Sequence, residues 1–247
     1  MSVHYELRAS TALITIDRPE RRNAVNLETA DLLQEAWHRF DADDKAAVGV
    51  LTGAQGVFSA GADLKDFDLV DRADGFLGFT RMIVSKPTIA AVEGYCLAGG
   101  LEMALWCDLR VAGDGAMFGC YERRFGVPLV DGGTQRLPRI VGMSRALDMI
   151  LTGRSVDAAE AHHIGLADRL TPAGSALETA LELASAIAAF PQATVRSDRL
   201  ALLEGLGRPL AEGLAIERRH GLGVLDAATE GAAHFENGAG RGGAPLR

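Results

Sequence analysis

Two turns rich in small residues are the part of this 247-residue sequence best suited to chemistry. Residues 58–63 (FSAGAD) and 95–102 (YCLAGGLE) each follow an apolar stretch, and each is expected to lead from a strand into a helix with an acid near its start. Small residues let a substrate approach the backbone, and a helix N-terminus leaves amide N–H groups unpaired. If the turns faced one point, they would form an oxyanion hole, whose donors each contribute about 3–4 kcal/mol to transition-state stabilisation. The alternative is that each Ala-Gly turn only lets a strand pack tightly against a helix.

The elements that must position these turns alternate between strands and helices, which indicates α/β architecture with a helical C-terminal part. Apolar runs and alternations predict strands at Val3–Arg8, 12–17, 48–52, Thr88–Val92, 109–112 and 167–171. Helical segments are expected at 27–40 with Asn26 as the N-cap, from near Asp63, at 101–107, and after residue 132 between breaks at Pro138, Gly153, Pro191 and Pro209.

Charge and composition exclude several classes of protein. A net charge of −8 argues against a nucleic-acid partner, because phosphate binding needs a basic surface. No apolar run approaches the roughly 18 residues of a membrane-spanning helix, so no membrane association is expected. The N-terminal segment does not have the pattern of a signal peptide. Cys96, Cys107 and Cys120 form neither an even disulfide set nor a CxxC metal pair, which favours a reducing cytoplasm and predicts no metal site.

Several segments resemble the enoyl-CoA hydratase/isomerase (crotonase) family and occur in the order typical of that family. These segments are 18–26 (RPERRNAVN), 58–65 (FSAGADLK), 90–110 (AAVEGYCLAGGLEMALWCDLR), 118–142 (FGCYERRFGVPLVDGGTQRLPRIVG) and 153–168 (GRSVDAAEAHHIGLAD). The resemblance implies a crotonase-like spiral of ββα units, with a C-terminal helical region that takes part in a homotrimer or a dimer of trimers. We therefore expect a spiral core over residues 1–190 and a helical region over 191–247.

The resemblance also implies which residues do the chemistry. Matched position by position, the backbone N–H groups of Ala62 and Gly99 would bind the thioester oxygen of an acyl-CoA, and Glu102 and Glu122 would be the catalytic pair of true hydratases. Without the resemblance, Glu102 is equally well explained as an exposed acid that stabilises a helix N-terminus. Glu122 is equally well explained as a loop acid paired with a neighbouring arginine.

The implied reaction is the syn addition of water to a 2-enoyl-CoA, through an oxyanion-stabilised enolate, to give 3-hydroxyacyl-CoA. Charge accumulates on the thioester oxygen as the enolate forms, so the two amides bind the transition state more tightly than the substrate. Two carboxyl groups in one closed site can have their pKa values pushed apart. We expect Glu102 mainly to activate water and Glu122 mainly to protonate C2. No cofactor is expected, because CoA arrives with the substrate.

An acidic protein needs local basic residues for the phosphates of CoA. Arg21, Arg22 and Lys65 are candidates, because they flank family positions near the CoA groove. Solvated surface charge explains any one of them equally well. Ala60 and Asp63, which belong to the first turn, are further candidates for substrate binding.

Residues 123–131 depart from the family pattern. Val130, also assigned to substrate binding, stands where hydratases usually have glycine and could alter the pocket floor. Asp131 could cap the following helix or join the chemistry. Arg123 and Arg124 stand where aliphatic residues are common, and they could lower the pKa of Glu122 or bind a polar acyl group.

Three functions remain open. The first is an enoyl-CoA hydratase, with straight-chain fatty acyl groups as the default substrate. The second is another reaction on the same scaffold, that of a double-bond isomerase, hydrolase or decarboxylase of acyl-CoA. The third is a protein that binds CoA or RNA with little turnover, although the negative charge conflicts with RNA. The glycine run at 238–243 is interpreted as a tail, and His162 and His163 as surface residues.

Overall fold

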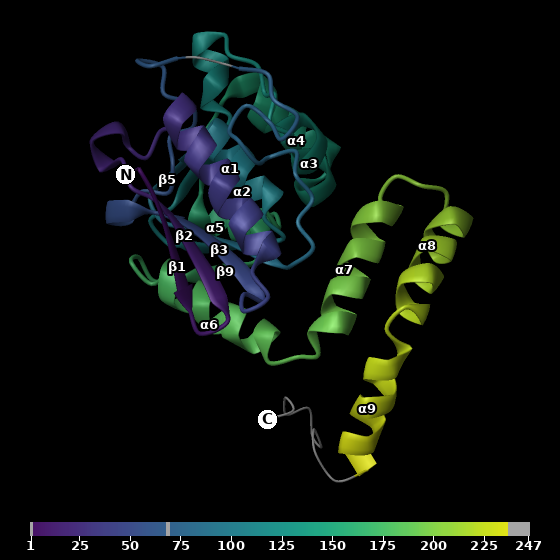
Figure 1. Ribbon diagram of the computed structural model, residues 1–247. Coiled ribbons are helices and arrows are strands. Elements are labelled where there is room, and N and C mark those ends of the chain that lie inside the picture. Colours follow the sequence, from purple (N-terminus) through teal and green to yellow (C-terminus); the bar gives the residue numbers. More distant parts are fainter. Residues whose placement is uncertain (1, 68–69, 237–247) are drawn as a thin grey trace.

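The computed structural model describes residues 2–67 and 70–236 of the chain, and in these residues two sheets form the centre of the fold (Figure 1). The larger sheet has the order β1-β2-β3-β4-β6-β9, and the smaller sheet has the order β5-β7-β8. Their strands are β1 (Val3–Arg8), β2 (Thr11–Ile16), β3 (Val48–Gly53), β4 (Thr88–Val92), β5 (Tyr95–Leu97), β6 (Leu109–Gly113), β7 (Met117–Gly119), β8 (Val156–Asp157) and β9 (Arg169–Thr171). The β1–β2 pair is antiparallel and every later pair of the larger sheet is parallel.

Helices follow most strands and cover the sheets. They are α1 (Leu27–Ala42), α2 (Gly99–Trp106), α3 (Gly133–Val141), α4 (Met143–Thr152), α5 (Ala158–His163), α6 (Ala176–Ala188), α7 (Gln192–Gly205), α8 (Leu210–Leu222) and α9 (Leu225–Glu236). Short 3₁₀ helices occur at η1 (Pro19–Arg21), η2 (Ala54–Gly56) and η3 (Tyr121–Phe125). Each of the described helices is too short or too polar to cross a bilayer.

The central strands of the larger sheet are buried on both faces, which explains their continuous apolar runs. Leu13, Val50 and Ile89 pack in one hydrophobic cluster with the alanine stripe of α6, whose small side chains let the helix lie close to the sheet. The residues that follow them, Ile14 and Leu51 among others, face the opposite cluster with α1. Because successive side chains of a strand point to opposite faces, the sheet separates two hydrophobic cores.

Helix α1 begins as its sequence predicts. The side-chain oxygen of Asn26 accepts a hydrogen bond from the backbone N–H of Thr29 at 3.1 Å, which satisfies one of the unpaired donors of the first turn. The face of α1 that carries Leu33, Trp37 and Phe40 is fully buried. The predicted N-cap and the start of this helix are confirmed.

The helix expected from near Asp63 is wrong, because the chain makes a turn there instead. An Asp63 carboxylate oxygen accepts a hydrogen bond from the backbone N–H of Lys65 at 3.1 Å. Such local side-chain bonds give the backbone an alternative to a helix. The helix after the second turn does form, and it begins at Gly99, two residues before the predicted start.

The C-terminal helices form an arm beside the sheets. Figure 1 shows α7 and α8 side by side, with α9 continuing away from the rest of the chain. Arg199 fastens α7 to the core through the Asp108 carboxylate and the Val84 carbonyl, both at 2.7 Å. Leu202 and Leu210 on this arm are 67% and 79% exposed. The division into a core of 1–190 and a helical region of 191–247 stays an interpretation, and the glycine run at 238–243 lies outside the described residues.

Candidate active site

The two turns of small residues lie in direct contact. Ser59 and Cys96 form a parallel bridge, in which the N–H of Ser59 donates to the Tyr95 carbonyl at 2.8 Å. Gly61 has a φ of +91°, and a Cβ at this position would lie only 2.6 Å from the amide nitrogen of Gly99. Glycine is therefore required at residue 61 both by its backbone conformation and by the approach of the second turn.

Two backbone amides at this contact are left without acceptors. Gly99 is the first residue of α2, so its N–H has no partner within the helix. Gly61 and Asp63 both bond to the backbone of Val25, whereas the N–H of Ala62 between them does not. Across residues 2–67 and 70–236, neither the Ala62 nor the Gly99 N–H has a hydrogen-bond acceptor. Both residues line one pocket of about 760 Å³.

A strained residue turns α2 toward this pocket. Ala98 has φ 51° and ψ −124°, a region that costs a residue with a side chain about 1–3 kcal/mol. Its N–H donates to the Gly119 carbonyl at 2.9 Å, and its carbonyl accepts from Glu102 at 3.2 Å. Strand β7 therefore holds the strained residue in place, and the N-terminus of α2 stays next to the first turn.

Glu102 is buried in the pocket wall and held at one oxygen. Its Oε1 accepts hydrogen bonds from the backbone N–H groups of Asp131 and Gly133, at 2.9 Å and 2.8 Å. Burial raises the pKa of Glu102 to about 8; the charges of Asp131 and Glu122 act in the same direction, and the two N–H donors oppose it. The interpretation of Glu102 as an exposed acid at a helix N-terminus is wrong, because its side chain is 3% exposed.

Glu122 lies in η3 and lines the same pocket. Its side chain is buried, and neither carboxyl oxygen has a hydrogen-bond partner among the described residues. Burial raises the pKa of Glu122, an effect that its own backbone N–H and the nearby charge of Arg123 reduce without reversing. The interpretation of Glu122 as a loop acid paired with an arginine is therefore wrong. A buried carboxyl group without a partner is costly, and such groups are concentrated at functional sites.

The two arginines of η3 have different surroundings. Arg123 points its guanidinium at the Ile150 carbonyl, 3.2 Å away, and it does not line the pocket. Arg124 lines the pocket, lies 3.6 Å above the ring of Tyr121 and donates to the Gly153 carbonyl at 3.1 Å. Arg124 is therefore the arginine of this pair that a substrate in the pocket can meet. Val130 also lines the pocket, as expected.

Asp131 does not cap the helix that follows it. The N-cap of α3 is Gly132, which has no side-chain cap. The Asp131 carboxylate instead accepts hydrogen bonds from the Leu77 N–H, at 3.2 Å, and from the Thr80 hydroxyl. The expectation that Asp131 caps α3 is wrong, because the backbone turns at Gly132 with φ +103° and directs this side chain into the protein.

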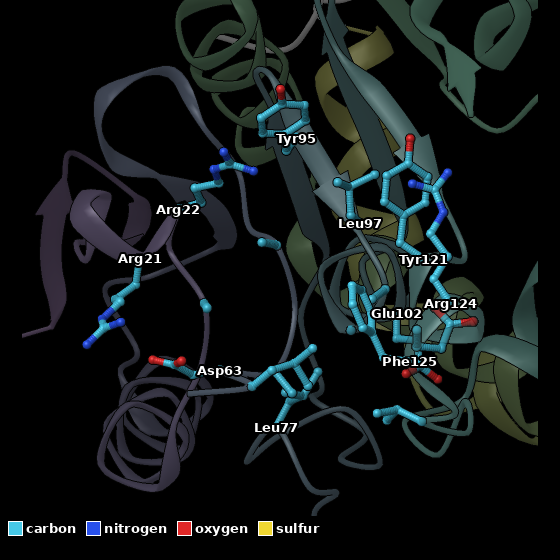
Figure 2. Close-up of a pocket in the computed structure, with 18 of the residues that line it drawn as sticks. Arg21, Arg22, Asp63, Leu77, Tyr95, Leu97, Glu102, Tyr121, Arg124 and Phe125 are labelled. Atoms are coloured by element: carbon cyan, nitrogen blue, oxygen red, sulfur yellow. The ribbon is translucent and has the colours of Figure 1, made fainter. Parts of the chain in front are cut away.

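The candidate CoA-binding residues lie on the wall opposite the two acids. Arg21, Arg22, Ala60, Asp63 and Lys65 all line the pocket. Figure 2 shows Arg21, Arg22 and Asp63 on one side of the cavity, facing Glu102 and Arg124 on the other. The three basic residues are exposed, so their positive charges lie at the rim of the pocket. The structure thus brings together all ten residues that the sequence assigned to catalysis or substrate binding.

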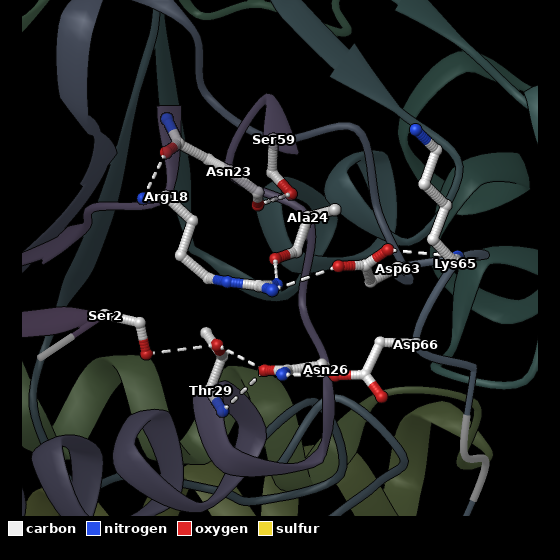
Figure 3. Close-up of polar contacts among 10 residues, drawn as sticks. All are labelled: Ser2, Arg18, Asn23, Ala24, Asn26, Thr29, Ser59, Asp63, Lys65 and Asp66. Atoms are coloured by element: carbon white, nitrogen blue, oxygen red, sulfur yellow. Dashed lines mark hydrogen bonds and ion pairs between the residues drawn. The ribbon is translucent and has the colours of Figure 1, made fainter. Parts of the chain in front are cut away.

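Asp63 is engaged in a structural ion pair. The Arg18 guanidinium bonds to the Asp63 carboxylate at 3.0 Å and to the Ala24 carbonyl at 2.5 Å (Figure 3). Burial acts to raise the pKa of Asp63, but the Lys65 N–H and Arg18 outweigh it, so the pKa lies below its usual value. Arg18 therefore links the loop after β2 to the first turn. No local pattern indicates this role, because a lone arginine before a proline has no partner that can be identified by spacing.

Several other residues of the pocket were not expected from the sequence. Leu77, Tyr95, Leu97, Met117 and Tyr121 line the cavity together with the acids. Only the family order of the surrounding segments could have indicated Tyr95, Leu97 and Tyr121. Leu77 comes from an irregular segment with no periodic pattern, so no local signal could have identified it.

Outside the pocket, the other candidates are structural. Both His162 and His163 are exposed, as expected, and His162 pairs with the Ala167 carbonyl at 3.1 Å. Ser59 donates to the Asn23 carbonyl and accepts from the Gly61 N–H, so its hydroxyl is fully used in shaping the turn. Within the described part of the chain, no three His, Cys, Asp or Glu side chains cluster as metal ligands would.

Comparison with known proteins agrees with this geometry. The sequence model of the enoyl-CoA hydratase/isomerase family matches residues 6–236. A probable enoyl-CoA hydratase of Rhizobium meliloti is 42% identical over 87% of this chain and 86% of its own, and one of Mycobacterium leprae is 40% identical over 90% of both. The crystal structure of an enoyl-CoA hydratase from Mycobacterium marinum superimposes with a TM-score of 0.93 at 38% identity, over 100% of this chain and 98% of that one.

This chain belongs to the enoyl-CoA hydratase/isomerase family. Its solved relatives have the crotonase fold, which confirms the fold class expected from the sequence. The part that the C-terminal helices take in trimer assembly stays a prediction.

Proposed function

We propose that this protein is an enoyl-CoA hydratase that adds water to the double bond of a 2-enoyl-CoA thioester. The observation that carries the proposal is the arrangement of one pocket: two unpaired amides, of Ala62 and Gly99, beside two buried acids, Glu102 and Glu122. The R. meliloti and M. leprae relatives are named as probable enoyl-CoA hydratases, which supports the same activity.

In the proposed reaction, the thioester oxygen accepts hydrogen bonds from the N–H groups of Ala62 and Gly99. These donors withdraw electron density from the conjugated double bond, so C3 becomes electrophilic. A carboxylate takes a proton from water as the water oxygen bonds to C3, and negative charge moves to the thioester oxygen. A carboxylic acid then gives its proton to C2, and the enolate collapses to the 3-hydroxyacyl thioester. The reaction balances without a redox group or a metal.

The two acids are assigned different roles by their contacts. Glu102 is held through Oε1 by two N–H donors, which favour a carboxylate, and its Oε2 remains to accept a proton from water. Glu122 has no donor on either oxygen among the described residues, so burial favours its protonated form. The pKa of Glu102, about 8, would by itself make Glu102 the protonated partner. We keep Glu102 as the base because its bond geometry presents one free oxygen, and because two acids in one site share protons as a pair.

The direct test is hydration of crotonyl-CoA by the purified full-length chain, followed as loss of enone absorbance with no added cofactor. We expect turnover, with 3-hydroxybutyryl-CoA as the product identified by mass. Retention of the enone together with migration of the double bond in a 3-enoyl-CoA would replace the hydratase with an isomerase. Release of free CoA would indicate a hydrolase, and loss of carbon dioxide from a carboxyacyl-CoA would indicate a decarboxylase. Inertness toward all these thioesters would leave a binding protein.

The raised pKa values predict a bell-shaped dependence of kcat/KM on pH. The reaction needs one protonated and one ionised carboxyl group. Activity should therefore fall at acid pH, on a limb lying above the ordinary value of 4.5, where both groups are protonated. It should fall again above about pH 8, where the shared proton is lost. Steady-state rates with crotonyl-CoA from pH 4.5 to 10 measure both limbs. A flat profile across pH 6 to 10 would contradict the shared-proton mechanism.

The exposed apolar arm supports a proposal about assembly. We propose that copies of this chain form a homotrimer or a dimer of trimers through α7 to α9, because many large apolar side chains along this arm are exposed on a single chain, among them Leu202, Leu206, Leu210, Leu214, Leu222, Leu225 and Phe235. Multi-angle light scattering should give three or six times the 26.1 kDa mass of one chain. A monomer at micromolar concentration would contradict it.

A cytoplasmic location is proposed on the absence of a disulfide set in the sequence alone.

A further inference from the structure

Asp131 bonds to two segments that lie far from it in the sequence, and the three meet at the pocket wall. Its backbone N–H donates to Glu102 Oε1 at 2.9 Å. Its carboxylate accepts from the Leu77 N–H at 3.2 Å and from the Thr80 hydroxyl. Its carbonyl accepts from Arg136 at 2.9 Å, and the same guanidinium donates to the Thr80 carbonyl at 2.6 Å. The side chain is 3% exposed.

The Asp131 carboxylate holds the segment of residues 75–80, which packs against the turn that carries the Gly99 amide. Leu77 lines the pocket, and its Cδ1 lies 2.9 Å from the position of a Cβ built on Gly99. Figure 2 shows Leu77 and Glu102 in the same lower part of the cavity. At the other end of this segment, Phe79 packs against Trp37 and Trp106, with ring centroids 5.5 Å and 4.8 Å apart. The segment is therefore fixed by aromatic packing at Phe79 and by the Asp131 carboxylate at Leu77 and Thr80.

A glycine makes room for this contact. Gly75 has a φ of +101°, and a Cβ there would lie 2.2 Å from the Thr80 hydroxyl and 2.8 Å from an Asp131 carboxylate oxygen. No side chain other than hydrogen fits beside the Asp131–Thr80 pair. The local backbone is thus built around the contact, and the contact is not an incidental surface pairing.

We propose that Asp131 is a positioning residue, whose main chain orients the carboxyl group of Glu102 and whose side chain fixes Leu77 against the oxyanion turn. This inference rests on the proposed hydratase function for its effect on catalysis, but the contacts themselves do not depend on it. Asp131 does not need to touch the reacting atoms to do either task.

The charge of Asp131 has a second consequence for Glu102. The charged and titratable groups that face Glu102 are Asp131, Glu122, Cys120 and Arg136. Among these, the negative charges of Asp131 and Glu122 disfavour ionisation of Glu102, and the guanidinium of Arg136 favours it. Removing the negative charge at residue 131 should therefore lower the pKa of Glu102. The alkaline limb of kcat/KM should move to lower pH with it.

The test compares Asp131→Asn, which keeps an acceptor oxygen but removes the charge, with Thr80→Val, which keeps the charge but removes the hydroxyl. The ionisation of Glu102 is read from the ¹³C resonance of its side-chain carboxyl, identified by its loss in Glu102→Gln. We expect Asp131→Asn to lower the Glu102 pKa and the alkaline limb by about one pH unit. We expect Thr80→Val to raise KM for crotonyl-CoA severalfold and leave the Glu102 pKa in place. Asp114→Asn, an exposed acid in the turn after β6, is the matched control and should change neither.

The outcomes separate this inference from the proposed function. An unchanged Glu102 titration in Asp131→Asn would overturn the electrostatic part of the proposal, whatever the activity. If the wild-type chain does not hydrate crotonyl-CoA, the hydratase proposal fails, and the carboxyl titration still decides whether Asp131 sets the state of Glu102. If Asp131→Asn does not fold, Asp131→Ser, which also lacks the charge, carries the same prediction. Unchanged KM in Thr80→Val would overturn the role of the Leu77 wall.

Discussion

Replacement of Glu122 by glutamine should lower kcat for crotonyl-CoA by about 10²- to 10⁴-fold, the contribution typical of one positioned acid–base group. Glutamine has nearly the same shape as glutamic acid, but its amide does not deliver a proton to C2. Neither Glu122 oxygen has a hydrogen-bond partner among the described residues, so the substitution breaks no contact of the fold. The amides of Ala62 and Gly99 stay in place, and thioester binding should persist.

The measurement is steady-state hydration together with calorimetric binding of a saturated acyl-CoA. We expect the dissociation constant of that ligand to change less than threefold. Glu35→Gln, an exposed acid on α1, serves as the control for a generic loss of charge. Activity equal to wild type in Glu122→Gln would remove Glu122 from the mechanism, and loss of ligand binding would show that the residue shapes the pocket instead.

Replacement of Glu102 by glutamine should abolish most activity and, at alkaline pH, make the protein more stable. The activity loss should be about as large as for Glu122, because the group that takes a proton from water is removed. The glutamine oxygen can still accept both N–H bonds, from Asp131 and Gly133. The fold around position 102 should therefore be kept.

The gain in stability follows from the pKa of Glu102. Burial raises that pKa from 4.5 to about 8, so between these values the folded chain holds, on the Glu102–Glu122 pair, a proton that the unfolded chain has released. Below pH 4.5 this group makes its full contribution to the free energy of unfolding. That contribution is lost as the pH rises to about 8. Glutamine cannot ionise, so Glu102→Gln does not lose this contribution to the free energy of unfolding over the same pH range. At pH 9 we expect Glu102→Gln to exceed wild type by a few kcal/mol in free energy of unfolding.

Urea unfolding of both proteins at pH 5 and pH 9 measures this effect. The difference between them should be small at pH 5 and large at pH 9. Glu122→Gln should show a change of the same sign, because the pKa of Glu122 is also raised. A difference that is constant with pH would show that Glu102 titrates normally. A substitution that lowers activity and raises stability is typical of a catalytic residue, because the native side chain destabilises the fold at that position.

The sequence predicted the central elements because their signals are local. The Asn26 cap, the apolar strands β3 and β4 and the helix after the second turn each need only a few neighbouring residues to specify them. The helix expected near Asp63 does not form because the Asp63 carboxylate bonds to the nearby Lys65 N–H, and a distant partner then holds that carboxylate in place. There the side chain pairs with Arg18, which lies 3.0 Å away in the structure but far away in the sequence. The short strands β5 and β7 were missed because three residues carry too little periodicity.

By itself, the sequence determined the family motifs, the ten candidate residues and the two turns that carry the amides. These follow from residue type and order, which are the same in the unfolded and the folded chain. Only the tertiary structure decided that Ala62 and Gly99 keep their N–H groups unpaired beside each other, that burial raises the pKa of Glu102 to about 8, and that Asp131 holds Leu77 and not the helix after it. The physical reason is that hydrogen-bond partners and desolvation depend on which distant segments enclose a group, and spacing along the chain does not specify that enclosure.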